Sequence, residues 1–307
     1  MRLSISKALL GTAMIAALAA AAACGGGGET SATPTGSTVG RLRVVATTTQ
    51  IADLARNVAG DRAEVASLVG PNQDPHEFEP RPDQLRALDN ANLVLRHGLG
   101  LDHFADKPLG SVSKEKVVVV TAGVRLIQDD PHVWFDVDNA KIMAANVRDA
   151  LVKADAANAG RYRANADAYL KELDQLNAFV RSETDRVPRG CRKLVTDHEV
   201  LTYYAAAYGF EIVDTVIPGS STEAEPSARD IATAVERIRS SGVPAVFAQA
   251  SANPQLMERV AREAGVKVVT GIYADSLGPP GSDGDTYIKM LRANTGRIVG
   301  ALEGCRG

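Results

Sequence analysis

Three histidines and one aspartate have the residue types and the spacing of a metal site. His76, His132 and His198 each follow a short apolar run rich in β-branched residues, and Asp275 follows a fourth run. Neutral imidazole nitrogens and a carboxylate are ligands that zinc takes, and together they can complete a four-coordinate site. We therefore predict that these four residues bind one metal ion, although any one of the histidines taken alone would equally suit a solvated loop.

Two of these histidines also share their local sequence. Asp-Pro-His occurs at residues 74–76 and again at 130–132, in a chain with only five histidines. The fixed φ angle of proline limits the backbone freedom of the approach to each imidazole. The repetition favours one shared role for His76 and His132 over two unrelated surface positions.

Strands and helices alternate on both sides of a long helical region. The alternation begins at residue 42 and resumes at residue 193. It predicts βαβ units and parallel sheets, in which ligands bind beyond the carboxyl ends of the strands. The expected strands are 42–47, 63–69, 93–96, 116–121, 193–196, 211–216, 245–247 and 266–270, and the expected helices are 51–58, one from 82, 200–208, 227–240, 254–264 and 285–302.

Residues 138–187 carry no strand signal. Apolar residues recur there at helical spacing, and a break near Asp155 and Gly160 divides the region into helices at about 138–154 and 156–185. The second helix would extend roughly 45 Å at about 1.5 Å per residue. The recurring apolar residues are Tyr162, Ala166, Tyr169, Leu173, Leu176 and Val180.

These patterns predict an α/β fold of two βα lobes, residues 42–137 and 188–307, each with a small parallel sheet. A long rigid backbone helix within residues 138–187 joins the lobes. Each lobe supplies two of the four ligands, so the metal site is expected in the interlobe cleft.

Residues 1–23 are expected to be a cleaved signal peptide. Arg2 and Lys7 precede an uncharged stretch, 8–23, that is shorter than the roughly 20 residues needed to span a bilayer. The sequence before Cys24 resembles a bacterial lipobox, with alanine in place of the usual leucine, so residues 24–41 are predicted to be a lipidated cysteine and a flexible tether rich in Gly, Ser, Thr and Pro. The expected location is the outer face of the cytoplasmic membrane, held by this lipid anchor alone. Without lipidation, the chain would be periplasmic or secreted.

The net charge limits the classes of partner, and the number of cysteines limits the possible disulfides. Lys and Arg number 34 against 37 Asp and Glu, a net charge of -3 with no basic cluster, which argues against nucleic acid. Three cysteines are too few for a disulfide scaffold. Cys191 precedes the first expected strand of the second lobe, and Cys305 follows its last expected helix. Export to an oxidising compartment favours a disulfide between them, with two free thiols as the alternative.

Several stretches together resemble one known family, the cluster A-I metal-binding proteins of bacterial ABC transporters for zinc and manganese. The resemblance covers the whole chain after the tether and implies ligands at the four positions named above. It also implies capture of the metal outside the cytoplasmic membrane, delivery to a membrane permease, and no catalysis. The matching stretches are 44–49, 74–80, 92–94, 98–101, 130–136, 196–198, 208–209, 221–227, 273–277 and 285–287.

Position 198 bears on the choice of metal. Manganese members of the family tend to have glutamate there and zinc members histidine, so His198 implies Zn²⁺, with Mn²⁺ as the alternative. Mn²⁺ also has the lowest affinity in the general order for divalent metals. The long loop rich in histidine and acidic residues found in many zinc members, expected between Val124 and Pro131, is missing here.

A zinc hydrolase and a surface adhesin are the two alternative classes of protein. A zinc hydrolase needs an open coordination position and a general base, and the His-Glu-x-x-His helix of many such enzymes is absent. A surface adhesin would bind its partner whether or not metal is present. We expect a monomer whose partner is the permease, with a metallochaperone as a further candidate.

The neighbours of the predicted ligands have expected roles as well. Trp134 should form a dry wall that holds His132 in one orientation. Glu223 and Glu225, and similarly Asp136 and Asp197, could accept hydrogen bonds from the ligand imidazoles, or simply be solvated. His97 and His103 match no ligand position, so a surface role is expected for both, with assistance in metal capture as the alternative.

Overall fold

Two four-stranded sheets, each with all of its strands parallel, form the framework of the protein. The computed structural model describes residues 40–305. In the first sheet the order is β2 (Ala63–Ser67), β1 (Leu42–Ala46), β3 (Leu93–Arg96) and β4 (Val117–Val119). Val44 of β1 pairs with Val65 on one side and Leu93 on the other. The predicted signal peptide, Cys24 and nearly all of the predicted tether lie outside the described residues.

The second sheet repeats this topology. Its order is β6 (Glu211–Thr215), β5 (Lys193–Thr196), β7 (Ala245–Gln249) and β8 (Lys267–Ile272). The two central strands of each sheet are rich in valine, leucine and alanine and are mostly buried, as expected for strands covered on both faces. The predicted fold class, an α/β protein with two small parallel sheets, is confirmed.

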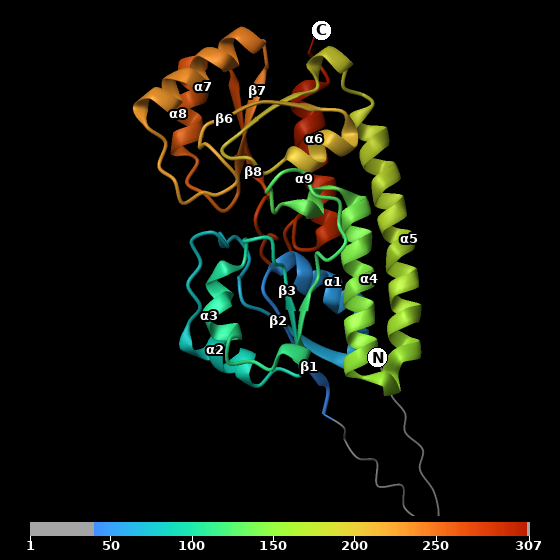
Figure 1. Ribbon diagram of the computed structural model, residues 1–307. Helices are drawn as coiled ribbons and strands as arrows, with labels where there is room; N and C mark the ends of the chain where they lie inside the picture. The colour runs from blue at the N-terminus through green and yellow to red at the C-terminus, as the bar shows by residue number, and fades with distance from the viewer. Residues whose placement is uncertain (1–39, 306–307) are drawn as a thin grey trace, which may run out of the picture. The chain divides into compact units, whose positions relative to one another are not determined.

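Shorter helices cover the two sheets (Figure 1). Two of them begin with clear side-chain caps: the Thr48 side chain accepts a hydrogen bond from the Ile51 amide, and Ser227 and Asp230 form a capping box. On the first sheet lie α1 (Thr49–Ala59), α2 (Pro82–Asp89) and α3 (Asp106–Leu109), and on the second α6 (Thr202–Tyr208), α7 (Ala228–Ser241), α8 (Gln255–Ala264) and α9 (Tyr287–Leu302).

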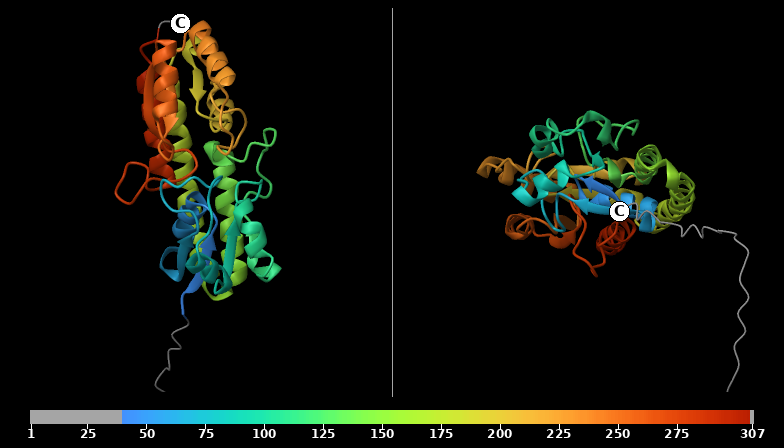
Figure 2. Two further views of the ribbon diagram at one scale, coloured as in Figure 1. Left: turned by 90° about the vertical axis from the view of Figure 1, so that its left-hand side faces the viewer. Right: turned by 90° about the horizontal axis from the view of Figure 1, so that it is seen from below.

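Two long antiparallel helices, α4 (Val137–Ala154) and α5 (Ala159–Thr184), run side by side (Figures 1 and 2). The break between them lies where the sequence predicted it, but a 3-10 turn at Ala156–Asn158 delays the start of α5 by three residues. Asp155 stabilises this turn because its carboxylate accepts hydrogen bonds from the Asn158 amide and the Tyr162 hydroxyl. The apolar face predicted for α5 is buried.

One hydrophobic core continues from the first sheet to the second. It contains residues of β1 and β3, of α1, α4, α5, α6 and α9, and of the loop 273–277 that follows β8. Two smaller clusters lie away from it, one under α2 and α3 and one under α7 and α8. The shared core gives the site a rigid support, because packed side chains resist displacement.

A disulfide joins Cys191, just before β5, to Cys305, just after α9, with the two Cα atoms 6.1 Å apart. The predicted pairing of these cysteines is therefore confirmed. None of the helices in residues 40–305 has the combination of length and apolar composition that crossing a bilayer requires.

Candidate metal centre

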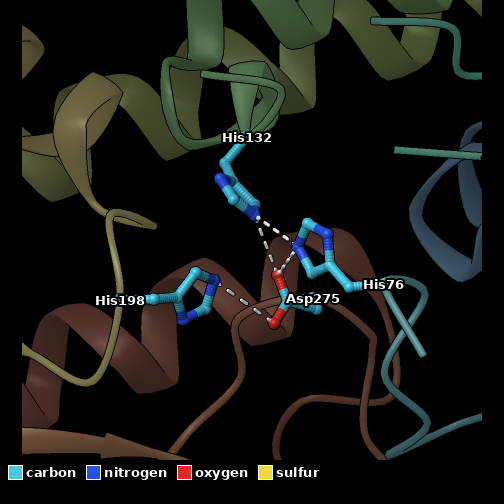
Figure 3. Close-up of side chains that lie close together, drawn as sticks. All are labelled: His76, His132, His198 and Asp275. Carbon is cyan, nitrogen blue, oxygen red and sulfur yellow. Dashed lines mark hydrogen bonds and ion pairs between the residues drawn. The ribbon is translucent and has the colours of Figure 1, made fainter. Parts of the chain in front are cut away.

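The four predicted ligands come from loops of both lobes, and their side chains lie close together (Figure 3). His76 follows β2, His132 lies just before a 3-10 turn at Val133–Phe135, His198 follows β5 and Asp275 follows β8. One ligand atom from each residue lies within 4.8 Å of all the others. Three of the side chains are fully buried, and that of His76 is 6% exposed. We call these four residues the His3Asp cluster.

Three Nε2 atoms surround the Asp275 carboxylate. The Nε2 atoms of His132 and His76 lie 3.0 and 3.9 Å from Oδ1, and that of His198 lies 3.6 Å from Oδ2. Despite these short distances, neither carboxylate oxygen receives a hydrogen bond of acceptable geometry. A buried carboxylate in this state is costly unless a positive charge compensates it. A divalent cation among the four atoms would supply that charge and use the nitrogen lone pairs.

Two aspartates orient two of the imidazoles. The Nδ1 atom of His132 lies 2.7 Å from Asp130 Oδ1, and that of His198 lies 3.0 Å from Asp197 Oδ1. An Nδ1–H that donates to a carboxylate leaves the Nε2 lone pair free for a metal. Asp197 is itself held in place by the backbone amide of Gln249, which donates to its second oxygen.

The Asp-Pro-His repeat has a common local geometry. Asp74 Oδ1 accepts from the backbone amide of His76 at 2.9 Å, and Asp130 Oδ1 accepts from that of His132 at 2.8 Å. In each case an aspartate side chain bonds the backbone two residues on, as in an Asx turn, and the proline between them restricts the chain further. The repeat therefore places both imidazoles by the same device.

The electrostatics of the cluster differ among the histidines. Burial lowers the pKa of His76 to about 4. Burial would also lower the pKa values of His132 and His198, but the facing carboxylates outweigh it: Asp130 and Asp275 raise the pKa of His132, and Asp275 and Asp197 raise that of His198. Burial would raise the pKa of Asp275, yet the surrounding imidazoles hold it below its usual range.

Trp134 lies edge-on to His132, with the ring centroids 5.3 Å apart, and is almost fully buried. It therefore forms an apolar wall beside this imidazole. Asp136 does not contact a ligand imidazole by hydrogen bonding; its side chain caps α4 by accepting from the amide of Asp138.

For Glu223 and Glu225 the structure agrees with the solvated alternative, whereas for His97 it differs from the expectation. Glu223 is exposed and lies 3.8 Å from His103, which is exposed too, and Glu225 is exposed; neither glutamate hydrogen-bonds a ligand imidazole, because the loop carries both outward. The surface role expected for His97 is wrong. Its side chain is fully buried, and Nε2 donates to the carbonyl of Pro131 at 2.8 Å, beside His132.

The contact between Asp130 and His132 was missed by the sequence reasoning. A signal for it was present, because an aspartate precedes each of the two histidines by two residues in the repeated tripeptide. The carboxylate at that position bonds the backbone in both copies, and in the second copy it bonds the imidazole as well.

Two parallel-sheet lobes packed on long helices, with a buried His3Asp cluster formed by residues of both, define the class of two-lobed proteins with a candidate metal site between the lobes. The chain belongs to the family described as "Zinc-uptake complex component A periplasmic", whose model matches residues 44–301. Members of this family are substrate-binding components of ABC transporters and not enzymes.

Individual relatives carry different metals in their names. The chain is 31% identical to the manganese-binding lipoprotein MntA of Halalkalibacterium halodurans, and the match covers 85% of this chain and 88% of MntA. It is 29% identical to the metal ABC transporter substrate-binding lipoprotein FimA of Streptococcus parasanguinis, and that match covers 86% of this chain and 90% of FimA. Among solved structures, the periplasmic zinc-binding protein TroA of Treponema pallidum matches with a TM-score of 0.81 and 30% identity, covering 86% of this chain and 99% of TroA. A mutant, manganese-bound periplasmic metal-binding protein of Candidatus Liberibacter asiaticus matches with a TM-score of 0.78 and 28% identity, covering 85% of this chain and 100% of the other.

Proposed function

We propose that this protein captures Zn²⁺ outside the cytoplasmic membrane and delivers it to the permease of an ABC transporter. The observation that carries the proposal is the convergence of three imidazole nitrogens and one buried carboxylate within 4.8 Å of one another. All four residues of the cluster act as ligands in this proposal. The ion is the cargo, so the site must both bind it and let it go.

The donor set supports zinc. Three neutral nitrogens and one oxygen are a combination that Zn²⁺ accepts in tetrahedral geometry, with bonds of about 2.0–2.2 Å. Mn²⁺ is the weakest binder in the general order of divalent metals and suits sites richer in oxygen. His198, whose Nδ1 bonds Asp197, is the nitrogen donor that makes this site richer in nitrogen than in oxygen.

Manganese is the second candidate, because several relatives are named for it. The 31% identical MntA is called manganese-binding, and PsaA of Streptococcus pneumoniae is called a manganese ABC transporter protein. A related structure was solved with manganese bound and another with cadmium. These names show that one fold serves more than one metal.

The cellular setting is part of the same proposal. The relatives are named as lipoproteins, which supports lipidation of Cys24 and anchoring to the outer face of the membrane. Stable anchoring needs more than one acyl chain, which the modified cysteine of a bacterial lipoprotein provides. The monomeric state stays a prediction, as does a metallochaperone as a further partner.

Separate titrations with the two metals test which ion the site prefers. The protein, purified without a tag and stripped of metal, is titrated calorimetrically with Zn²⁺ and with Mn²⁺, as are His198→Glu and the control His103→Ala. We expect the parent and the control to bind Zn²⁺ far more tightly than Mn²⁺, and His198→Glu to lose zinc affinity while its Mn²⁺ affinity changes little or rises. A parent protein that prefers Mn²⁺ would contradict the zinc assignment.

A further inference from the structure

Asp275 has no hydrogen bond of its own to direct its carboxylate. The side chain is fully inaccessible to solvent, and neither of its carboxylate oxygens has a hydrogen-bond partner. The hydrogen bonds that hold this ligand in place are therefore those of the backbone on either side of it. That backbone, residues 273–277, follows β8 of the second sheet.

Helix α1 of the first lobe holds this backbone on both sides of Asp275. The Leu277 amide donates to Thr49 Oγ1 at 2.8 Å, and Gln50 Nε2 donates to the carbonyl of Ala274 at 3.4 Å. Thr49 Oγ1 in turn donates to Gln50 Oε1 at 3.1 Å. The bonds form a closed ring, because the Thr49 hydroxyl fixes the Gln50 amide with its NH2 group toward Ala274.

Within residues 40–305, the side-chain hydrogen bonds of Thr49 and Gln50 join them to each other and to this loop. Thr49 is 5% exposed and Gln50 fully buried, in the first turn of α1. Further along the same helix, Asp53 Oδ2 accepts from the amide of Tyr287 at the start of α9. The Asp275 loop also has hydrogen bonds within its own lobe, because Asn294 of α9 accepts from the Tyr273 amide and donates to the Tyr273 carbonyl. The loop of His198 differs in its bonds at Asp197, which accepts from the amides of Gln249 and Ile217, both in the second lobe.

We propose that Thr49 and Gln50 are positioning residues that fix Asp275 against the histidines of the first lobe, a role that rests on the proposed metal site. Asp275 comes from the second lobe in sequence, but through the Thr49–Gln50 ring it is fastened to the lobe that carries His76 and His132. The ring sets the 3.0 Å approach of Asp275 Oδ1 to His132 Nε2.

The test compares Thr49→Val, Thr49→Ser and Gln50→Met in the full chain, with Thr184→Val as the matched control. Thr184 is also buried, and its hydroxyl donates only within α5. We expect Thr49→Val and Gln50→Met to weaken zinc binding about tenfold, the lower end of the range for residues that orient ligands. Thr49→Ser, which keeps the hydroxyl, and the control should bind as the parent does. The absorption spectrum of the Co²⁺ form should change in Thr49→Val and be restored in Thr49→Ser, because it reports the geometry of the ligands.

A double-mutant cycle with Asp275→Ala separates this role from a general loss of structure. If the ring acts through Asp275, Thr49→Val and Gln50→Met will cause no further loss of zinc affinity once Asp275 is gone. An equal loss in both backgrounds, or no loss in the parent background, overturns the positioning role while leaving the metal site standing. If Thr49→Val does not fold, the cycle of Gln50→Met with Asp275→Ala tests the same positioning role. Parent-like zinc affinity in Asp275→Ala itself would overturn the proposed ligand set, and the positioning role with it.

Discussion

His132 and Asp130 show how a single contact prepares a ligand for metal. The carboxylate of Asp130 receives both the backbone amide and the ring Nδ1–H of His132. It therefore sets the tautomer, the ring orientation and the basicity of this imidazole together. Asp197 makes the same two contacts with His198.

Removing the Asp130 carboxylate should weaken metal binding strongly. We expect Asp130→Ala to lower zinc affinity by about 10- to 100-fold, because the imidazole loses its orientation and its anionic partner. Asp130→Asn should cost less, since an amide oxygen can still accept from Nδ1. Competition with a chromophoric chelator measures both, and Asp129→Ala, an exposed neighbour, is the control. Equal affinities for Asp130→Ala and the control would refute the orienting role.

Zinc affinity should fall as the pH is lowered. The carboxylates raise the pKa values of His132 and His198 above the ordinary 6.5, so protons compete with the metal for these two nitrogens already near neutral pH. His76, whose pKa burial lowers to about 4, stays neutral between about pH 8 and about pH 5.5 and contributes little to the effect. Calorimetric titrations between about pH 8 and about pH 5.5 should show weakening over the whole interval, with release of protons on binding. A flat profile would argue against histidine ligands.

Residue types and spacing were enough to predict which four side chains come together, but not the surroundings of these side chains. His76 and His132 could be found because they share a tripeptide, and Asp275 because it follows a strand. The burial of His97 could not be predicted, since it depends on a contact with the Pro131 carbonyl, 34 residues away in the sequence. The ring of Thr49 and Gln50 with residues 274 and 277 joins positions more than 200 residues apart, beyond any local pattern.

At the scale of elements, the two sheets place the ligands by one rule. Both have the same strand order, and all four ligands follow carboxyl ends of strands, where parallel sheets bind ligands. Alternating apolar runs and helical spacing predicted this arrangement. The short helix α3 and the 3-10 turns were not predicted, because segments of three or four residues are too short to show a period.

The disulfide should stabilise the second lobe without shaping the metal site. Cys191 precedes β5, whereas His198 follows it, so the bond lies at the opposite end of this strand from the ligand. We expect replacing both cysteines by serine to lower the free energy of unfolding by about 2–5 kcal/mol. Zinc affinity should stay close to that of the parent. Chemical denaturation of the metal-free protein measures the first effect, and an unchanged midpoint would show that the bond contributes nothing.

At the scale of the whole molecule, export and anchoring rest on the N-terminal region. If Cys24 is lipidated, the parent protein will fractionate with membranes, and Cys24→Ala will appear in the soluble exported fraction or the medium. Ser31→Ala is the control, since it changes a residue of the predicted tether and keeps both Cys24 and the disulfide. Membrane association that survives in Cys24→Ala would contradict the lipoprotein assignment.

The account of the whole molecule depends on one ion held jointly by two lobes, and anomalous diffraction from zinc-loaded crystals tests it most directly. Data collected at the zinc absorption edge should show a single strong peak between the sheets. It should lie about 2.0–2.2 Å from Nε2 of His76, His132 and His198 and from a carboxylate oxygen of Asp275. A peak elsewhere, or one contacted by residues of a single lobe, would contradict the central claim.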